Sequence, residues 1–151
     1  MSREMLRCSC VVGLVSLLAV VATAGAGVSP LIYRGGAKGV SMTVTLPPKV
    51  GSPDSRFVLH FTPAALPIWR RVKGTKLTAF CVWPLKNGGE GWAAITRMNS
   101  KRRSLSMGTV ERPSTGVYTC GLHVGGGHPE SWPWTSYIRS ALVAARLRRS
   151  N

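Results

Sequence analysis

Residues 104–120 read SLSMGTVERPSTGVYTC and contain two alternating apolar segments. Leu105 and Met107 share one face of the first expected strand, and Tyr118 and Cys120 share one face of the second. The Pro-Ser-Thr-Gly sequence between the two segments is typical of a tight turn. The stretch therefore predicts two consecutive β-strands whose apolar sides face a common core.

Similar alternation continues toward the N-terminus. Turn residues separate short segments whose apolar side chains recur at every second position. These side chains are Val40, Met42, Val44 and Leu46, then Phe57, Leu59 and Phe61, then Leu77, Ala79 and Cys81, and then Trp92 and Ala94. Several short strands at this spacing predict an all-β domain, either a sandwich or a similarly closed sheet.

The order Cys81, Trp92, Tyr118, Cys120 resembles that of the immunoglobulin superfamily. The local sequences GTKLTAFC, ending at Cys81, and GWAAI, around Trp92, resemble the second and third strands of that family. Residues 104–120 resemble its consecutive E and F strands. The short separation of the two cysteines favours a constant- or intermediate-type domain over a variable-type one.

The resemblance implies an immunoglobulin-like antiparallel β-sandwich with one inter-sheet disulfide, between Cys81 and Cys120. Trp92 would pack against this disulfide in the core, and the Tyr118 hydroxyl would tie the adjoining corner to nearby backbone. The remaining core residues named by the resemblance are Leu105, Met107 and Val110.

Residues 1–26 have the three-part order of a secretory signal peptide: Arg3 and Arg7 precede an apolar run, and small residues follow. Cleavage is expected after Ala24 or Ala26, which would give a secreted protein without membrane attachment. The alternative is an uncleaved signal anchor that holds the domain at a membrane. Export to an oxidising compartment also predicts pairing of the two remaining cysteines.

The rest of the chain divides into three expected parts. Residues 27–66 form an N-terminal strand or arm whose structure the sequence leaves open. Residues 67–142 contain the immunoglobulin-like core. Residues 143–151 are rich in arginine and are expected to form a basic C-terminal tail.

The chain is strongly basic, with 20 Lys and Arg against 5 Asp and Glu and a formal charge of +15. Such a charge favours polyanionic partners. The densest cluster is Lys101, Arg102 and Arg103, and a second cluster lies between Arg70 and Lys76. Each cluster has two interpretations, a solvated basic turn or a footprint for a polyanion such as heparan sulfate. A sequence-specific nucleic-acid site is not expected.

The segment from Gly125 to Trp132 is expected to form a loop between the last two strands. Its glycines would give mobility, and Trp132 and Trp134 would offer an apolar contact surface. The alternative is that both tryptophans pack inward against the end of the sandwich.

The sequence contains no arrangement typical of catalysis, and we expect no catalytic residues and no cofactor. Its few carboxylates occur at no telling spacing. His123 and His128 flank the glycine loop, but no thiolate or carboxylate completes a metal site with them, so no metal is expected.

These observations predict an exported module that acts by protein–protein recognition. The resemblance implies an extracellular or cell-surface protein as partner, as for immune proteins or the immunomodulatory proteins that viruses secrete. One alternative is a basic extracellular protein that binds a polyanion, either heparan sulfate or nucleic acid. Another is a signal-anchored membrane protein with an immunoglobulin-like ectodomain.

Overall fold

The structure is a computed structural model that describes residues 29–49, 55–99 and 101–151. The expected signal peptide, residues 1–26, lies outside the described residues. Within the described ranges, no helix is long and apolar enough to cross a bilayer. The elements are β1 (Leu31–Ala37), β2 (Val40–Leu46), β3 (Ser55–Phe61), a 3-10 turn η1 (Pro63–Ala65), α1 (Leu66–Val72), β4 (Leu77–Pro84), β5 (Glu90–Met98), β6 (Ser104–Gly108), β7 (Val117–Val124), α2 (Trp134–Ser140) and β8 (Val143–Arg149).

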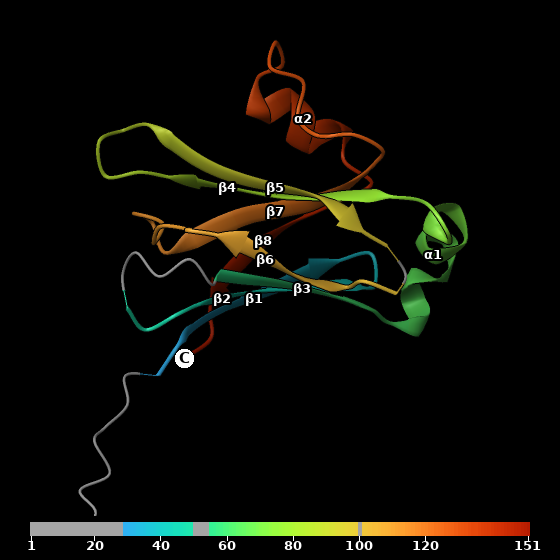
Figure 1. Ribbon diagram of the computed structural model, residues 1–151, viewed down its shortest axis with the longest axis horizontal. Coiled ribbons are helices and arrows are strands. Elements are labelled where there is room, and N and C mark those ends of the chain that lie inside the picture. The colour runs from blue at the N-terminus through green and yellow to red at the C-terminus, as the bar shows by residue number, and fades with distance from the viewer. Residues whose placement is uncertain (1–28, 50–54, 100) are drawn as a thin grey trace, which may run out of the picture.

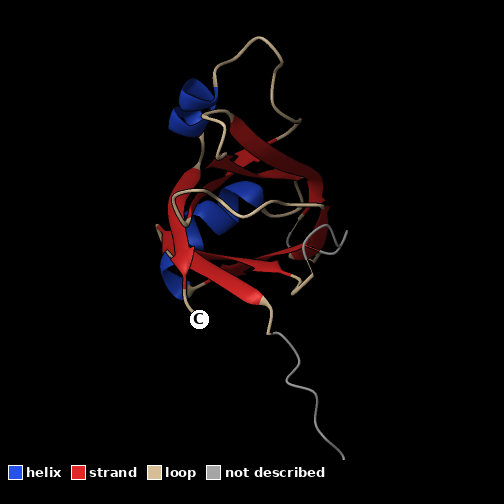
Figure 2. Cartoon of the chain, turned by 90° about the vertical axis from the view of Figure 1, so that its left-hand side faces the viewer, coloured by secondary structure: helices blue, strands red, loops and turns tan. Residues whose placement is uncertain are grey.

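All strands belong to one antiparallel sheet with the order β5-β4-β7-β8-β1-β2-β3-β6 (Figure 1). The two edge strands, β5 and β6, are consecutive in the chain and lie close together, so the sheet curls round on itself. Figure 2 shows the strands surrounding a common interior. The prediction of an antiparallel all-β fold is thus confirmed, as one rolled sheet.

Alternating side chains build the interior as the sequence predicts. Met42 and Val44 of β2 and Phe57 of β3 are fully buried, while the residues between them face outward. Helix α1 connects β3 to β4 and covers one end of the interior, where Ile68 and Val72 pack against the core. Burial of apolar surface by strands distant in the sequence is the main favourable contribution to this fold.

Cys81 and Cys120 form the predicted disulfide, which spans a sequence separation of 39 residues. The prediction that it joins two sheets is wrong, because Cys81 of β4 and Cys120 of β7 are direct partners on neighbouring strands of the same sheet. In the immunoglobulin fold the corresponding strands lie in opposite sheets. The strand order therefore differs from that of the immunoglobulin sandwich.

Tyr118 fixes the corner that precedes β7. Its ring is fully buried, with centroids 4.8 Å from the ring of Tyr33 and 5.4 Å from that of Trp83. Its hydroxyl donates a hydrogen bond of 2.5 Å to the backbone carbonyl of Glu111. This is the tie to nearby backbone that the sequence predicts.

Two other predicted core residues, Leu105 and Met107 of β6, are partly buried and pack against the interior cluster. Their strand lies at an edge of the sheet, where packing is less complete than at its centre.

The C-terminal residues do not form the expected tail. Residues 143–149 are strand β8, which lies between β7 and β1 near the middle of the sheet. Val143 and Leu147 are buried, whereas Arg146 and Arg148 face outward. Residues 27–66, whose structure the sequence left open, supply β1, β2 and β3, so the core extends well beyond the predicted limits of 67–142.

Candidate functional site

Trp92 lies on the outer face of the sheet. The register of β4 and β5 places Trp92 opposite Val82 and Ala93 opposite Cys81. Directly paired residues share a face of the sheet, and Cys81 faces the core because it is bonded to the buried Cys120. Trp92 consequently points outward and is 57% exposed. The prediction that Trp92 packs in the core against the disulfide is wrong.

Trp83 takes the interior position that was expected for Trp92. It follows Cys81 by two residues on β4, so both side chains face inward, and it is only 4% exposed. Its partner on β5 is Gly91, where a Cβ atom would lie 2.3 Å from Nε1 of Trp83. A glycine at position 91 therefore leaves the space that the indole ring fills.

Helix α2 covers the outer face of β4. Its apolar side chains follow the i, i+3, i+4, i+7 spacing of one helix face. A second hydrophobic cluster results, formed by Phe80, Val82 and Tyr137 with Trp134, Ile138 and Ala141 packed against it. The outer face of this strand is therefore covered by a layer of mainly aromatic side chains, which lies outside the curled sheet.

Trp134 is the central ring of this layer. It stacks on His128, with centroids 3.9 Å apart and planes 28° apart. It also lies 5.5 Å from the ring of Trp92 and 5.5 Å from that of Tyr137. These contacts hold Trp134 in place, and they join the segment 128–134 to strand β5.

The two tryptophans of this segment differ, and neither packs into the interior as the second alternative expected. Trp134 is partly buried against Phe80, with centroids 6.0 Å apart. Trp132 is 49% exposed and belongs to the surface. One indole anchors the segment and the other is presented to solvent.

The two histidines of this region pack against aromatic rings. His123 stacks on Tyr137 at a centroid distance of 3.9 Å, and its Nε2 lies 2.8 Å from the Tyr137 carbonyl oxygen. His128 stacks on Trp134. Among the residues that the structure describes, no group of three or more His, Cys, Asp or Glu side chains could hold a metal ion.

The glycine loop is held at its start by Thr78. The fully buried Thr78 hydroxyl donates a hydrogen bond to the carbonyl of Gly125 and lies 3.0 Å from that of Gly126. The sequence alone did not reveal this anchor, because a threonine in an apolar strand gives no signal of its partner. The anchor fixes where the loop leaves β7.

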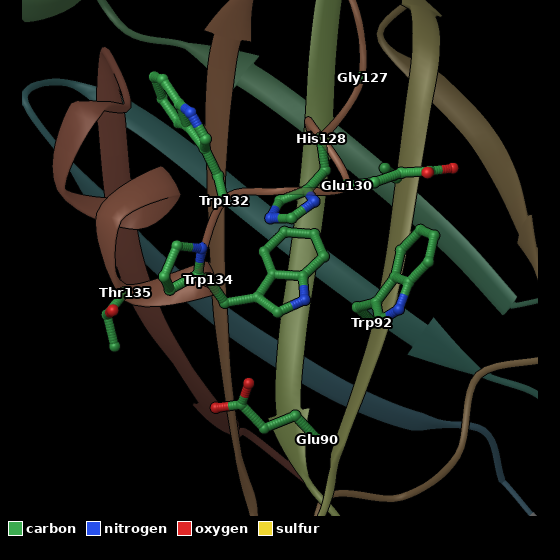
Figure 3. Close-up of a pocket in the computed structure, with 10 residues that line it drawn as sticks. Glu90, Trp92, Gly127, His128, Glu130, Trp132, Trp134 and Thr135 are labelled. Carbon is green, nitrogen blue, oxygen red and sulfur yellow. The ribbon is translucent and has the colours of Figure 1, made fainter.

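An open groove of about 730 Å³ lies between β5 and the segment 127–135. We call it the tryptophan groove; its lining residues are Glu90, Trp92, Ala94, Gly127, His128, Glu130, Trp132, Pro133, Trp134 and Thr135. Figure 3 shows Glu90 and Glu130 on opposite sides of the Trp92 and Trp134 pair. No lysine or arginine lines the groove. Its surface thus combines exposed indoles with two carboxylates.

A basic end lies where α1 and the β5–β6 connection meet (Figure 1). Strand β4 begins here opposite the end of β5, since Leu77 pairs with Met98, and the Leu59 amide of β3 donates to the Arg103 carbonyl at 2.7 Å. The exposed cations are Arg70, Arg71, Lys73, Lys76, Arg97, Lys101, Arg102 and Arg103. The two basic clusters of the sequence therefore share one end of the molecule.

The side chain of Asn99 shapes the β5–β6 connection within this basic end. Its Oδ1 accepts hydrogen bonds from the backbone amides of Lys101 and Arg102, both at 2.8 Å. The Asn99 side chain thereby holds the backbone of the turn, and the cationic side chains of Lys101 and Arg102 stay exposed.

A second hollow, of about 700 Å³, has different chemistry. It lies beside the β4–β5 turn, and its lining includes Lys49, Lys86 and Arg112 together with Glu111. No aromatic side chain lines it. Mixed charges without an aromatic surface give it fewer features of a recognition site than the tryptophan groove has.

Sequence reasoning missed part of the groove. It selected Trp132 and Trp134 but assigned Trp92 to the core and gave no role to Glu90 or Glu130. Comparison with protein families, with curated proteins and with solved structures finds no match to this chain. The chemistry of the groove and of the basic end is therefore the basis on which function can be inferred.

Proposed function

We propose that this chain is an exported binding module that recognises another protein through the tryptophan groove. The observation that carries the proposal is the exposure of Trp92 and Trp132 on one groove. They are two of the four large hydrophobic side chains that are exposed among the described residues; the others are Leu66 and Val124. Clustered exposed apolar surface is typical of contact sites, and tryptophan is enriched among the residues that dominate binding energy.

The groove is also suited to recognition because its base is well packed. Trp134, His128 and Tyr137 contact one another, and both α2 and the glycine loop are anchored on β4. A surface that is ordered before binding loses less conformational entropy when a partner arrives. The proposal does not require the strand order of the immunoglobulin sandwich.

The test is an array of purified extracellular ectodomains probed with the wild-type chain and with Trp92→Ala. Truncation of a central tryptophan costs about 2 kcal/mol or more at a binding hot spot, so affinity should fall by about 30-fold or more. Leu66→Ala, which removes an exposed apolar side chain outside the groove, is the matched control and should leave affinity unchanged. A partner that binds Trp92→Ala as tightly as wild type would contradict the proposal.

A second candidate function is binding of a sulfated polysaccharide at the basic end. The specific observation in its favour is that eight exposed cations from two sequence clusters meet there, while no Asp or Glu occurs in residues 55–89 or 91–110. Such a field attracts polyanions, and the attraction weakens with salt.

Heparin chromatography tests this second function. Charge reversal at Lys101, Arg102 and Arg103 should lower the salt concentration of elution, and reversal of Arg70 and Arg71 should lower it further. Reversal of Arg146 and Arg148, which lie on β8 outside the basic end, is the control for net charge. Equal shifts from both sets would show that heparin responds to total charge alone.

A further inference from the structure

The charge of the tryptophan groove is opposite to that of the whole molecule. The chain carries a formal charge of +15, yet the groove is lined by Glu90 and Glu130 and by no lysine or arginine. Glu111 is the third glutamate among the described residues, and it lines the second hollow instead. The groove is therefore a local anionic site on a cationic protein.

The aromatic rings of the groove favour the same sign of ligand. The face of an indole attracts a cation through its quadrupole, and tryptophan is the strongest of the aromatic side chains in this respect. Trp92 is 57% exposed, and its ring lies 5.5 Å from that of Trp134 at an angle of 41°. Two tilted indoles with a carboxylate on each side provide both the π-faces and the charges that bind a cation (Figure 3).

We infer that the tryptophan groove binds an arginine- or lysine-bearing segment of a partner protein. This inference rests on the proposed function and names the chemistry of the partner. A guanidinium stacks on an aromatic ring and also pairs with a carboxylate through two parallel hydrogen bonds, so arginine matches this lining best. The alternative of a neutral sugar ring would use the indoles but leave Glu90 and Glu130 without a charged partner.

Part of the basic end adjoins the glycine loop, because the Gly125 amide donates to the Lys76 carbonyl and Gly127 lies next to Thr96, the residue before Arg97. The screening length is about 8 Å at physiological ionic strength, so only cations within about that distance oppose a cationic ligand in the groove. The basic end is formed by α1 and the β5–β6 connection, none of whose cations line the groove. Contacts within the groove then decide whether a cationic or an anionic ligand binds.

The experiment is a nuclear magnetic resonance titration of the tryptophan indole N–H signals of the full chain. The probes are the peptide acetyl-Gly-Ser-Arg-Ser-Gly-amide and the same peptide with citrulline, which keeps the shape of arginine without its charge. The arginine peptide should shift the signals of Trp92 and Trp134 but not that of the buried Trp83. It should bind at least about tenfold more tightly than the citrulline peptide. Equal binding of the two peptides would overturn the inference.

Matched variants test whether the carboxylates of Glu90 and Glu130 bind the arginine side chain. The double variant Glu90→Gln and Glu130→Gln should weaken binding of the arginine peptide about tenfold or more, whereas Glu111→Gln should leave it unchanged. All three glutamates are exposed, so these variants should fold as wild type does. Unchanged binding in the double variant would overturn the inference while leaving the proposed function intact, provided that Trp92→Ala still abolishes partner binding.

Sedimentation of the chain alone distinguishes a partner protein from a second copy. A monomer is expected at the concentration used for the titration. Self-association that disappears in the Glu90→Gln and Glu130→Gln variant would show that a second copy of the chain occupies the groove, and it would overturn the assignment to a different protein.

Discussion

The two faces of β4 are both buried, but by different means. On the inner face, Cys81 and Trp83 belong to the closed interior. Cys81 is bonded to Cys120 there, and the ring of Trp83 packs against that of Tyr118. On the outer face, Phe80 and Val82 lie beneath α2 in a small cluster with an open edge. The inner aromatic residues therefore stabilise the fold, whereas the outer layer leaves indole surface exposed for binding.

The largest contrast is expected between two tryptophans on paired strands. Trp83→Ala should lower the free energy of unfolding by about 3–5 kcal/mol, because it leaves a cavity in the core. Trp92→Ala should lower it by less than about 1 kcal/mol, because Trp92 is 57% exposed. Urea unfolding of both variants measures the difference. Similar losses in the two variants would show that the outer layer contributes to stability as the interior does.

The disulfide should contribute to the stability of the inner face and not to binding. Replacing both Cys81 and Cys120 by alanine should reduce the free energy of unfolding by about 2–4 kcal/mol, because the bridge restricts the unfolded chain. The unfolding midpoint should fall, while the binding properties of the folded fraction stay unchanged. A folded variant with an altered groove would show that the two faces are coupled.

Alkaline pH distinguishes the two faces through their tyrosines. Burial raises the pKa of Tyr118 on the inner side, where Tyr33 adds to the rise and Arg112 opposes it, and burial also raises the pKa of Tyr137 on the outer side. An unfolded tyrosine ionises near pH 10. The stability from these neutral phenols is therefore complete below about pH 10 and is lost as the pH rises further.

Above pH 10 the expected loss approaches about 1.4 kcal/mol per pH unit for Tyr118, and Tyr137 adds to it in the same direction. Tyr118→Phe should remove most of this pH dependence and Tyr137→Phe should reduce it, which unfolding experiments between pH 9 and 11 can measure. A slope that Tyr137→Phe does not change would show that the outer layer opens before the interior.

The sequence predicted which residues share a face of a strand but not always which face is inward. The alternation of Leu77, Ala79 and Cys81 identified the inner face of β4 correctly. For β5, the grouping of Trp92 with Ala94 was correct, but a shift of one residue separates the inner from the outer face. The pairing of β4 with β5 decides this, and pairing is a tertiary property.

The C-terminal strand was missed for a related reason. Its outer face carries Arg146 and Arg148, and the apolar side chains on its interior side are Val143, Leu147 and the small Ala145. A strand with such a sparse apolar face looks like a solvated tail until its neighbours β7 and β1 are known. The aromatic groove could not be predicted either, because it combines β5 with a segment more than 30 residues later in the chain.

The most direct test of the central claim is hydroxyl-radical footprinting of the chain, alone and bound to a partner captured on the ectodomain array. The account predicts that oxidation of Trp92 and Trp132 falls strongly on binding, while the basic end stays as accessible as before and Trp83 stays protected in both states. Unchanged oxidation of Trp92 and Trp132 in the complex, with protection elsewhere on the surface, would contradict the claim that the tryptophan groove is the recognition site.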